Sequence, residues 1–316
     1  MFKLKPSFKD YLWGGTKLKT DFHKDCDLEK VAESWELSTH KYGLTIIETG
    51  KHKGETLLSY VEKYGKDVLG SKCNLDKDIP ILIKFIDAKE PLSIQVHPDN
   101  EYALKNENDF GKTEMWYIID AEPGAKLIYG FKEDVTKEQF KKAIEENTLE
   151  NLVNEVEVFA GDVFFITPGT MHAIGKGIVI AEIQQRSNVT YRIYDFGRVG
   201  ADGKPRELHI DKALDVTKLN SAKNAKEQYT LEQFDGYEKG VLSSCQYFNV
   251  ELINILEKAT LNCDDTTFHC LTVLDGQCTI NGNDTLDAKK GESIFIPANY
   301  GKYTITGKCK VILSTI

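Results

Sequence analysis

The sequence predicts a mainly β protein made of two related β domains, with a few helices packed around the first. Three observations support this fold class. Short apolar or alternating runs bounded by turn residues outnumber helical patterns along the 316 residues. A β pattern at residues 161–168 recurs at 291–297. A polar stretch at 218–238 precedes a region of almost continuous strand character. We therefore expect a first domain at residues 1–220, a linker at 221–238 and a second domain at 239–316.

The first domain contains six predicted strands and two predicted helices. Period-two alternation or a short apolar run marks the strands at residues 92–97, 114–119, 126–129, 163–166, 178–184 and 190–195. Apolar residues at helical spacing predict a helix over 55–68. A second helix begins after Thr136, because Gln139 three positions later completes a capping box.

The repeated β pattern connects the two predicted domains. Residues 161–168 (GDVFFITP) resemble residues 291–297 (GESIFIP), and a strand–turn–strand pattern precedes each. A short strand that is entered through Gly and an acidic residue and left through Pro resembles a motif of the cupin superfamily. The resemblance implies two cupin-type jelly-roll barrels, a fold that holds its ligands inside.

Composition and charge exclude several classes of partner. The net formal charge of −9 repels polyphosphates, so we expect no nucleic acid. No apolar run approaches the ~18 residues that a membrane span needs, and the N-terminal residues lack the apolar stretch of a signal peptide. We expect a cytoplasmic protein without a membrane partner, as a monomer or homodimer. The seven cysteines are an odd set without a Cys-x-x-Cys pair, which indicates reduced thiols.

The predicted strand at 92–97 has one polar and one apolar face. Ser93, Gln95 and His97 alternate with apolar residues, and successive side chains of a strand point to opposite sides. This pattern indicates a polar barrel interior. The same parity directs Lys112 and Glu114 to one side of the next strand.

His172 completes a candidate metal site. It follows the strand at 163–166 after a Thr-Pro-Gly bend that directs its side chain across the barrel mouth. His97, His172 and Glu114, with the Gln95 amide oxygen as a candidate fourth ligand, form a nitrogen and oxygen set that suits Zn²⁺; Fe, Mn, Co and Ni are alternatives. His269 takes the place of Glu114 in the second domain, which has no counterpart of His172. We therefore expect metal in the first domain only.

The remaining histidines carry less information. His23, His40 and His52 lie in polar stretches and are predicted at the surface. His209 lies between two apolar residues, and either a place near a site or simple packing would explain it.

Six runs of sequence, in the same order along the chain, together resemble type I phosphomannose isomerases of the short bacterial form. They are LWGG (12–15), AESWELS (32–38), PILIKFIDAKEPLSIQVHPDN (80–100), GKTEMWYII (111–119), GDVFFITPGTMHAIG (161–175) and SNVTYRIYDFGR (187–198). The similarity covers residues 1–215 and is weak beyond them. It implies an aldose–ketose isomerase with one Zn²⁺ per chain, which interconverts mannose 6-phosphate and fructose 6-phosphate through an enediol or enediolate.

The resemblance also implies roles for particular residues. The zinc ligands of the family fall on Gln95, His97, Glu114 and His172. Its essential arginine falls on Arg192, its acid on Glu182 and its site lysines on Lys84 and Lys112, while a basic residue of the longer members falls on Arg198. We expect catalytic roles for Arg192, Glu182 and Lys112. We expect substrate contacts from Arg198, Lys84 and Ser93.

The chemistry of the residues is consistent with this assignment. Glu182 is the only carboxylate in the apolar run 178–183, so burial is expected to raise its pKa toward that of a useful base. A Glu182 that points to solvent is the alternative. Arg192 and Arg198 are candidates for the phosphate, because a guanidinium offers two parallel donors and the net charge of the chain does not attract an anion.

Two other classes of cupin remain as alternatives. A cupin dioxygenase would use a similar metal, but this chain lacks the close His-x-His-x(3 or 4)-Glu spacing and has Glu114 far downstream of His97. A non-catalytic sugar-binding cupin would have lost part of the ligand and base set, which is complete here. Metal analysis combined with a hexose-phosphate turnover assay separates the three.

Overall fold

The structure is a computed structural model that describes residues 1–200, 203–222 and 225–316. These residues contain 22 strands, six α-helices and one short 3-10 helix. The predicted mainly β class is therefore confirmed. Within the described ranges, no helix has both the length and the apolar character that crossing a bilayer requires.

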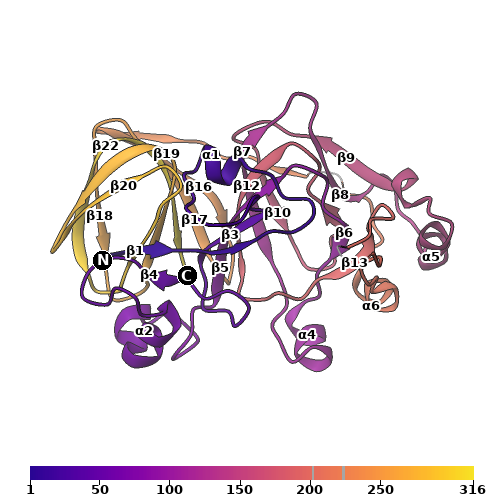
Figure 1. The fold of residues 1–316 in the computed structure, drawn as a ribbon, viewed down its shortest axis with the longest axis horizontal. Coiled ribbons are helices and arrows are strands. Elements are labelled where there is room, and N and C mark those ends of the chain that lie inside the picture. Colours follow the sequence, from indigo (N-terminus) through magenta and orange to yellow (C-terminus); the bar gives the residue numbers. More distant parts are fainter. Residues whose placement is uncertain (201–202, 223–224) are drawn as a thin grey trace.

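Two sheets face each other across a shared core and carry the predicted site residues (Figure 1). The seven-stranded sheet has the order β14-β10-β7-β12-β5-β3-β2, and the five-stranded sheet has the order β13-β6-β11-β8-β9. The first sheet consists of β2 (Ser7–Lys9), β3 (Glu33–Leu37), β5 (Ile81–Ala88), β7 (Glu114–Ala121), β10 (Val163–Ile166), β12 (Ile178–Gln185) and β14 (Lys226–Glu227). The second consists of β6 (Ile94–Val96), β8 (Lys126–Phe131), β9 (Val153–Glu157), β11 (His172–Ala173) and β13 (Tyr191–Tyr194). Each of the six predicted strands corresponds to one of these.

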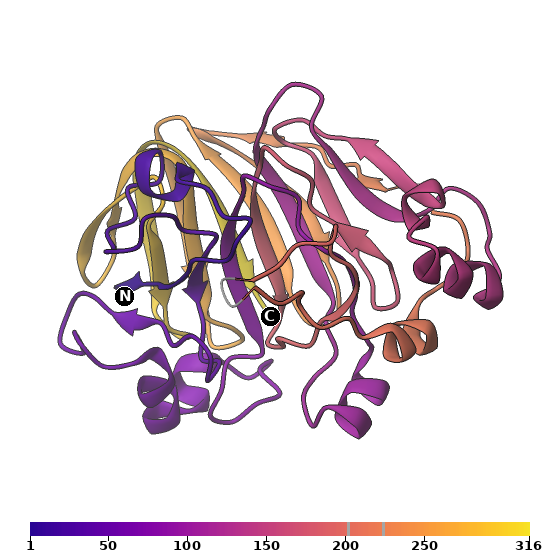
Figure 2. The ribbon, with the colours of Figure 1, turned by 45° about the vertical axis from the view of Figure 1, so that its right-hand side comes forward.

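A third, ten-stranded sheet contains the C-terminal strands (Figure 1, orange to yellow). Its strands are β15 (Glu232–Phe234), β16 (Tyr237–Ser244), β17 (Asn249–Ile255), β18 (Lys258–Cys263), β19 (His269–Asn281), β20 (Thr285–Lys289), β21 (Ser293–Ile296), β22 (Gly301–Thr315), β1 (Phe2–Lys5) and β4 (Ile46–Ile47). The N-terminal strand β1 pairs with β21, and Figure 2 shows the indigo segment beside the yellow strands. The first residues of the chain thus extend the sheet formed by the last ones.

The repeated β pattern forms equivalent structures in the two parts of the chain. Its strands are β10 and β21, and each pairs with the long strand that precedes it. Glu114 pairs with Ile166 in the first part, and His269 pairs with Ile296 in the second. The predicted equivalence of His269 and Glu114 is therefore confirmed by strand register.

One core cluster joins the seven-stranded sheet to the C-terminal sheet. On β12, Val179, Ala181 and Ile183 point into this cluster, whereas Ile178 and Ile180 point to the core between the two facing sheets. The alternation follows from the period-two geometry of a strand. It leaves β12 buried on both faces, which explains why the sequence of this strand is an almost continuous apolar run.

The helices are α1 (Lys17–Thr20), α2 (Leu57–Tyr64), α3 (Lys66–Leu69), α4 (Asn100–Asn106), α5 (Lys137–Glu145) and α6 (Ile210–Val216), and Leu149–Asn151 is the 3-10 helix. The predicted capping box is confirmed, because the Thr136 hydroxyl accepts from the Gln139 amide and Gln139 returns a bond to the Thr136 amide. The helix predicted over 55–68 is interrupted at Gly65, which has φ of 54° and separates α2 from α3.

Two other expectations need correction. His40 and His52 are buried rather than at the surface, with 1% and 8% of their area exposed. The predicted linker 221–238 contains β14, which pairs with β10, and β15, which pairs with β16. Its polar composition reflects exposed edge strands, since all three residues of β15 are exposed. Residues 223 and 224 of this stretch, and residues 201 and 202 of the predicted first domain, lie outside the described residues.

Candidate metal centre and sugar-phosphate cavity

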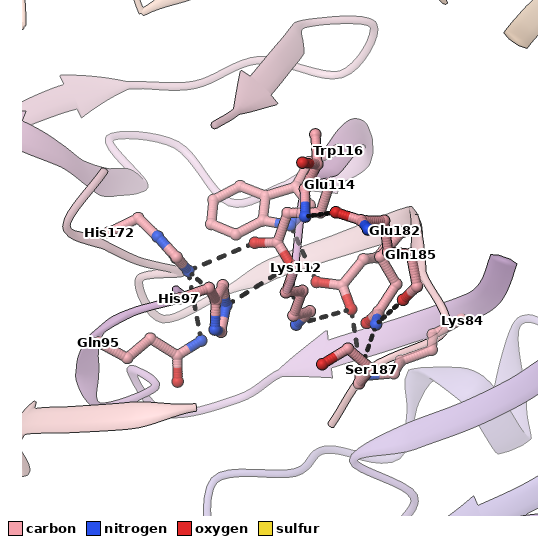
Figure 3. A network of polar contacts seen from close by, with 12 residues as sticks. Lys84, Gln95, His97, Lys112, Glu114, Trp116, His172, Glu182, Gln185 and Ser187 are labelled. Atoms are coloured by element: carbon pink, nitrogen blue, oxygen red, sulfur yellow. Dashed lines mark hydrogen bonds and ion pairs between the residues drawn. The ribbon is translucent and has the colours of Figure 1, made fainter. Parts of the chain in front are cut away.

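Three predicted metal ligands converge between the two facing sheets (Figure 3). His97 follows β6, His172 begins β11, and Glu114 begins β7 in the opposite sheet. The Nε2 atoms of the two histidines lie 3.2 Å apart. The Glu114 carboxylate lies 3.3 Å from Nε2 of His172 and 3.7 Å from Nε2 of His97. All three side chains are buried, so the arrangement excludes bulk water.

Hydrogen bonds on the far side of each imidazole identify which nitrogen carries the proton. Nδ1 of His97 is 2.9 Å from the carbonyl of Val189, and Nδ1 of His172 is 2.8 Å from that of Thr170. Because a carbonyl only accepts, each Nδ1 donates and each Nε2 presents its lone pair to the other imidazole. Two facing lone pairs beside a carboxylate repel each other unless a cation lies between them.

The chemistry of these groups therefore fits a divalent cation. The Glu114 carboxylate is fully buried, and one of its oxygens contacts the Lys112 ammonium at 2.8 Å. Backbone carbonyls orient both imidazoles from behind, as is usual for histidines that bind metals. The Gln95 amide lies 3.4 Å from Nε2 of His172, and a flip of the amide would present its oxygen instead of its nitrogen. These nitrogen and oxygen donors suit Zn²⁺.

Burial shifts the pKa values of His97, His172 and Glu114 in the direction that favours the uncharged form of each side chain. Burial lowers the pKa of His172 to about 4 and that of His97 well below its usual value, and the positive charge of Lys112 contributes to both shifts. Burial raises the pKa of Glu114 to about 7, although Lys112, at 2.8 Å, opposes this shift. The two histidines are therefore neutral and ready to bind a metal at physiological pH.

Strand register brings Glu182 beside Lys84 and Trp116 of the neighbouring strands, and Lys112, which precedes β7, lies close to it (Figure 3). Glu182 of β12 pairs with Lys84 of β5 on one side and with Trp116 of β7 on the other. Its carboxylate lies 3.1 Å from Nζ of Lys84 and 3.7 Å from Nζ of Lys112, and Nε1 of Trp116 donates to it at 3.0 Å.

The expected upward shift in the pKa of Glu182 is wrong. Burial alone would raise this pKa, but Lys112 and Lys84, together with the hydrogen bonds from Lys84 and Trp116, lower it to about 2. The run around Glu182 is apolar in sequence, yet its cross-strand neighbour Lys84 and the nearby Lys112 are cationic. Glu182 is therefore ionised throughout the physiological pH range.

A cavity of about 260 Å³ lies beside the metal cluster. Gln95 and Lys112 line it and also contact the cluster, so the cavity and the candidate metal adjoin each other. Its charged lining residues are four cations and two carboxylates: Lys84, Lys112, Arg192, Arg206, Glu33 and Glu182. A local excess of positive charge in a protein of net charge −9 indicates an anionic ligand.

The structure brings most of the predicted site residues to this cavity. Those that line it are Lys84, Ser93, Gln95, Lys112, Glu182 and Arg192. Arg198 does not belong to the lining; its guanidinium bonds to Asp195 and to the carbonyl of Pro91. Its predicted contact with substrate stays a prediction. Nε of Arg192 is buried without a partner, and one of its terminal nitrogens donates to the carbonyl of Glu207.

Several lining residues were not identified from the sequence. Arg206 lies outside every run that carried the family resemblance, and Asp195 holds its guanidinium at 2.7 Å. Trp13, Glu33, Asn188 and Thr190 also line the cavity. These four lie within the runs LWGG, AESWELS and SNVTYRIYDFGR. The family resemblance of these runs could therefore have indicated them as site residues.

Two protein-family models match this chain, one at each end. Residues 1–120 match the model described as "Phosphomannose isomerase type I, catalytic domain", and residues 238–316 match "Mannose-6-phosphate isomerase, cupin domain". These matches agree with the predicted cupin-type fold.

Curated relatives and solved structures match over the whole length. The mannose-6-phosphate isomerase ManA of Bacillus subtilis is 38% identical over 315 residues, which cover 98% of this chain and 97% of the relative. The mannose-6-phosphate isomerase of Streptococcus mutans is 36% identical and covers 96% of this chain and 94% of the relative. A crystal structure of mannose 6-phosphate isomerase from Bacillus subtilis is 33% identical, with a TM-score of 0.93 over 100% of this chain and 99% of that chain. A mannose 6-phosphate isomerase solved with zinc and yttrium bound has the same fold, with a TM-score of 0.80 at 18% identity over 99% of this chain and 98% of that chain.

Proposed function

The chain belongs to the mannose-6-phosphate isomerase family of aldose–ketose isomerases, and we propose that it acts with one zinc ion through an enediolate intermediate. The observation that supports this proposal best is the position of His97, Glu114 and His172 beside a cationic cavity. The metal would lie near the reacting carbons of the sugar, and the cationic side chains would bind the phosphate. A protein of the same fold has been solved with zinc and yttrium bound.

His97, His172 and Glu114 would hold the zinc ion, with Gln95 as the fourth ligand. When bound, zinc acts as a Lewis acid that polarises the sugar carbonyl and stabilises negative charge on oxygen. Lys112 reaches the same region, because its ammonium lies 2.8 Å from Glu114 and also lines the cavity. It supplies a second positive charge near the oxygen atoms that become negative.

Transfer of hydrogen between C1 and C2 needs a base on the cavity wall, and we assign this role to Glu182. Its carboxylate is ionised and lines the cavity. Lys84 and Lys112 make it a weak base in the free enzyme. Substrate oxygens that attract these lysines would weaken their hold on Glu182, and its pKa would then rise toward that of an effective base.

The phosphate of the substrate requires fixed cations at the other end of the cavity. Arg192 and Arg206 both line it, and a guanidinium can donate two parallel hydrogen bonds to a phosphate. The two guanidiniums are held by the carbonyl of Glu207 and by Asp195, respectively, so they are positioned before substrate arrives. Pre-positioned cations bind an anion at a lower cost in side-chain entropy.

We assign the chemistry to the predicted first domain and a structural role to residues 239–316. Every lining residue of the cavity lies between Tyr11 and Arg206. Within the described residues, His97, Glu114 and His172 form the single cluster of His, Cys, Asp or Glu that could hold a metal. His269, at the position equivalent to Glu114, bonds to the Tyr303 hydroxyl at 2.8 Å.

Isomerisation in D₂O tests this proposal. The chelator-treated protein and the same protein with zinc restored would be incubated with mannose 6-phosphate, and the products analysed by NMR. We expect turnover to depend on zinc, with solvent deuterium at C1 of fructose 6-phosphate. Full turnover after metal removal would contradict the zinc assignment. Complete retention of the substrate hydrogen would contradict the enediolate.

A further inference from the structure

Two cysteines of the C-terminal sheet lie diagonally opposite each other on neighbouring strands. Cys278 of β19 pairs with Gly307 of β22, and Cys309 of β22 pairs with Gly276 of β19. Positions two apart on a strand share a face, so both thiols point to the same side. Both residues belong to the core cluster of this sheet.

The two glycines make this approach possible. A Cβ atom at Gly307 would lie 3.1 Å from Cα of Cys278, and one at Gly276 would lie 2.9 Å from Cα of Cys309. Such contacts are tighter than real Cβ atoms normally make, and both glycines have positive φ, at 131° and 76°. Each cysteine thus lies opposite a glycine, which has no side chain. The space beside that glycine remains open to the thiol of the other cysteine.

Each of the two thiols shifts the pKa of the other. Interaction with Cys309 lowers the pKa of Cys278, whereas interaction with Cys278, together with burial, raises the pKa of Cys309. The positive charge of Lys3 also lowers the pKa of Cys278. The pair therefore consists of one sulfur with more thiolate character and one that retains its proton.

Cys278 is accessible from a cavity that the proposed isomerase reaction does not use. This cavity has a volume of about 580 Å³ and is lined by Cys278, Gly307 and residues of β1, β20 and the turn before β21. Cys278 and Cys309 are 6% and 8% exposed, whereas Cys73, Cys263 and Cys270 are at most 1% exposed. Cys26 and Cys245 are more accessible, but neither lies on one of the described strands.

We propose that Cys278 and Cys309 form a dithiol site that is reversibly oxidised to a disulfide by low-molecular-weight disulfides. The Cys278 thiolate attacks one sulfur of the oxidant, its S–S bond breaks, and one thiol leaves with a mixed disulfide left on Cys278. Cys309 then loses its proton and attacks Cys278, which releases the second thiol. One S–S bond forms in the protein, one is lost from the oxidant, and two thiols are produced.

This oxidation would connect β19 to β22 without altering the isomerase site. Neither cysteine lines the cavity that contains Glu182 and Arg192. Because the crosslink closes a loop in the unfolded chain, the oxidised protein is expected to have a higher Tm than the reduced protein, with turnover unchanged.

Peptide mapping of the full-length protein tests the proposal. The reduced, folded protein would be incubated with oxidised glutathione, quenched with acid, alkylated and digested without reductant. We expect the peptides of Cys278 and Cys309 to be linked, with the loss of two hydrogens, and a reductant to reverse the link. Absence of this linked peptide from the folded protein would overturn the proposal.

Two single variants identify the order of events. In Cys309→Ser, the link is lost and Cys278 should accumulate as the glutathione mixed disulfide. In Cys278→Ser, the link is lost and Cys309 should stay largely unmodified. Cys270→Ser, on the same strand but without a thiol neighbour, is the matched control and should form the link normally. Equal modification of Cys309 in Cys278→Ser would overturn the assigned roles, and circular dichroism of each variant verifies the fold.

Discussion

Glu114 and Glu182 are both buried carboxylates of the proposed site, yet their pKa values shift in opposite directions. Burial raises the pKa of Glu114 to about 7, with one lysine in contact to oppose it. Burial acts on Glu182 too, but two lysines and a tryptophan N–H outweigh it and lower that pKa to about 2. Such a separation between neighbouring carboxylates is typical of sites where the groups have different tasks.

The pKa of Glu114 predicts how metal affinity depends on pH. A proton on Glu114 competes with the metal below pH 7, whereas His172, with a pKa of about 4, takes up no proton until much lower pH. Apparent zinc affinity should fall about tenfold per pH unit between pH 7 and 5, the slope for one proton. Competition with a zinc indicator at each pH measures this affinity. The Glu114→Gln variant should lose most of the metal, because it lacks one of the ligands. A two-proton slope would show instead that the histidines are protonated.

Removal of the charge at Glu182 should affect turnover more than binding. Glu182→Gln is expected to lower kcat by roughly 10² or more with KM nearly unchanged, because a base acts mainly in the transition state. Glu33→Gln is the matched control, since Glu33 also contacts Lys84, at 3.5 Å, but has no assigned role in proton transfer. Near-normal turnover in Glu182→Gln would favour Lys112 as the base.

Arg206 and Arg198 both bond to Asp195, but their replacement should affect phosphate binding differently. Arg206→Ala is expected to raise KM for mannose 6-phosphate by roughly 10- to 100-fold, since it removes a charge-assisted hydrogen bond. The effect on unphosphorylated mannose should be small. Arg198→Ala should have a weaker effect, because Arg198 does not line the cavity. Steady-state kinetics with both sugars measure these effects. A rise in KM for mannose 6-phosphate, but not for mannose, in Arg198→Ala alone would contradict the assignment.

At the scale of elements, strand register places the site residues. Glu182 meets Lys84 and Trp116 because β12 pairs with β5 and β7 in one particular register. On the other sheet, Gln95 pairs with His172 on one side and Arg192 on the other. A slip by one residue would turn every one of these side chains to the opposite face, so the apolar faces of the strands also specify the site.

The cap of α5 provides a test at this scale. Thr136→Ala removes a hydroxyl that accepts from the Gln139 amide and should lower the free energy of unfolding by about 1 kcal/mol. Thr148→Ala is the control, because Thr148 precedes the 3-10 helix without a side-chain cap bond. Urea unfolding measures both variants, and turnover should be unchanged. An equal effect of the two substitutions would contradict the importance of the capping box.

At the scale of the whole molecule, the N-terminal strand connects the predicted domains. Phe2 of β1 stacks on Phe295 of β21, with ring centroids 5.4 Å apart, and also contacts Tyr60 of α2. These residues belong to the cluster that continues through the seven-stranded sheet. Residues from both ends of the chain thus share one core.

This shared core predicts cooperative unfolding. Phe2→Ala should lower the free energy of unfolding by about 3–5 kcal/mol, as expected for loss of a buried aromatic ring. Calorimetry should show a single transition at a lower Tm, because residues of both sheets belong to one core cluster. Phe159→Ala, at a residue that is 58% exposed, is the control and should have little effect. Two separate transitions, with only one moved by Phe2→Ala, would show that the domains unfold independently.

The sequence by itself determined the strands, the repeat and the face on which Gln95 and His97 lie. These features follow from the alternation of side chains along a strand, which is local and can be seen in the order of residues. The equivalence of His269 and Glu114 was predictable for the same reason, because the repeat preserves strand parity.

Only the tertiary structure decided which charges surround Glu182, that Arg206 rather than Arg198 lines the cavity, and that β1 joins the C-terminal sheet. His40 and His52 lie in polar stretches of sequence but are buried by segments distant along the chain. A pKa, an exposed surface and a cavity wall each depend on which strands become neighbours. Pairing between residues far apart in sequence sets those neighbours, and no local pattern of residue types contains that information.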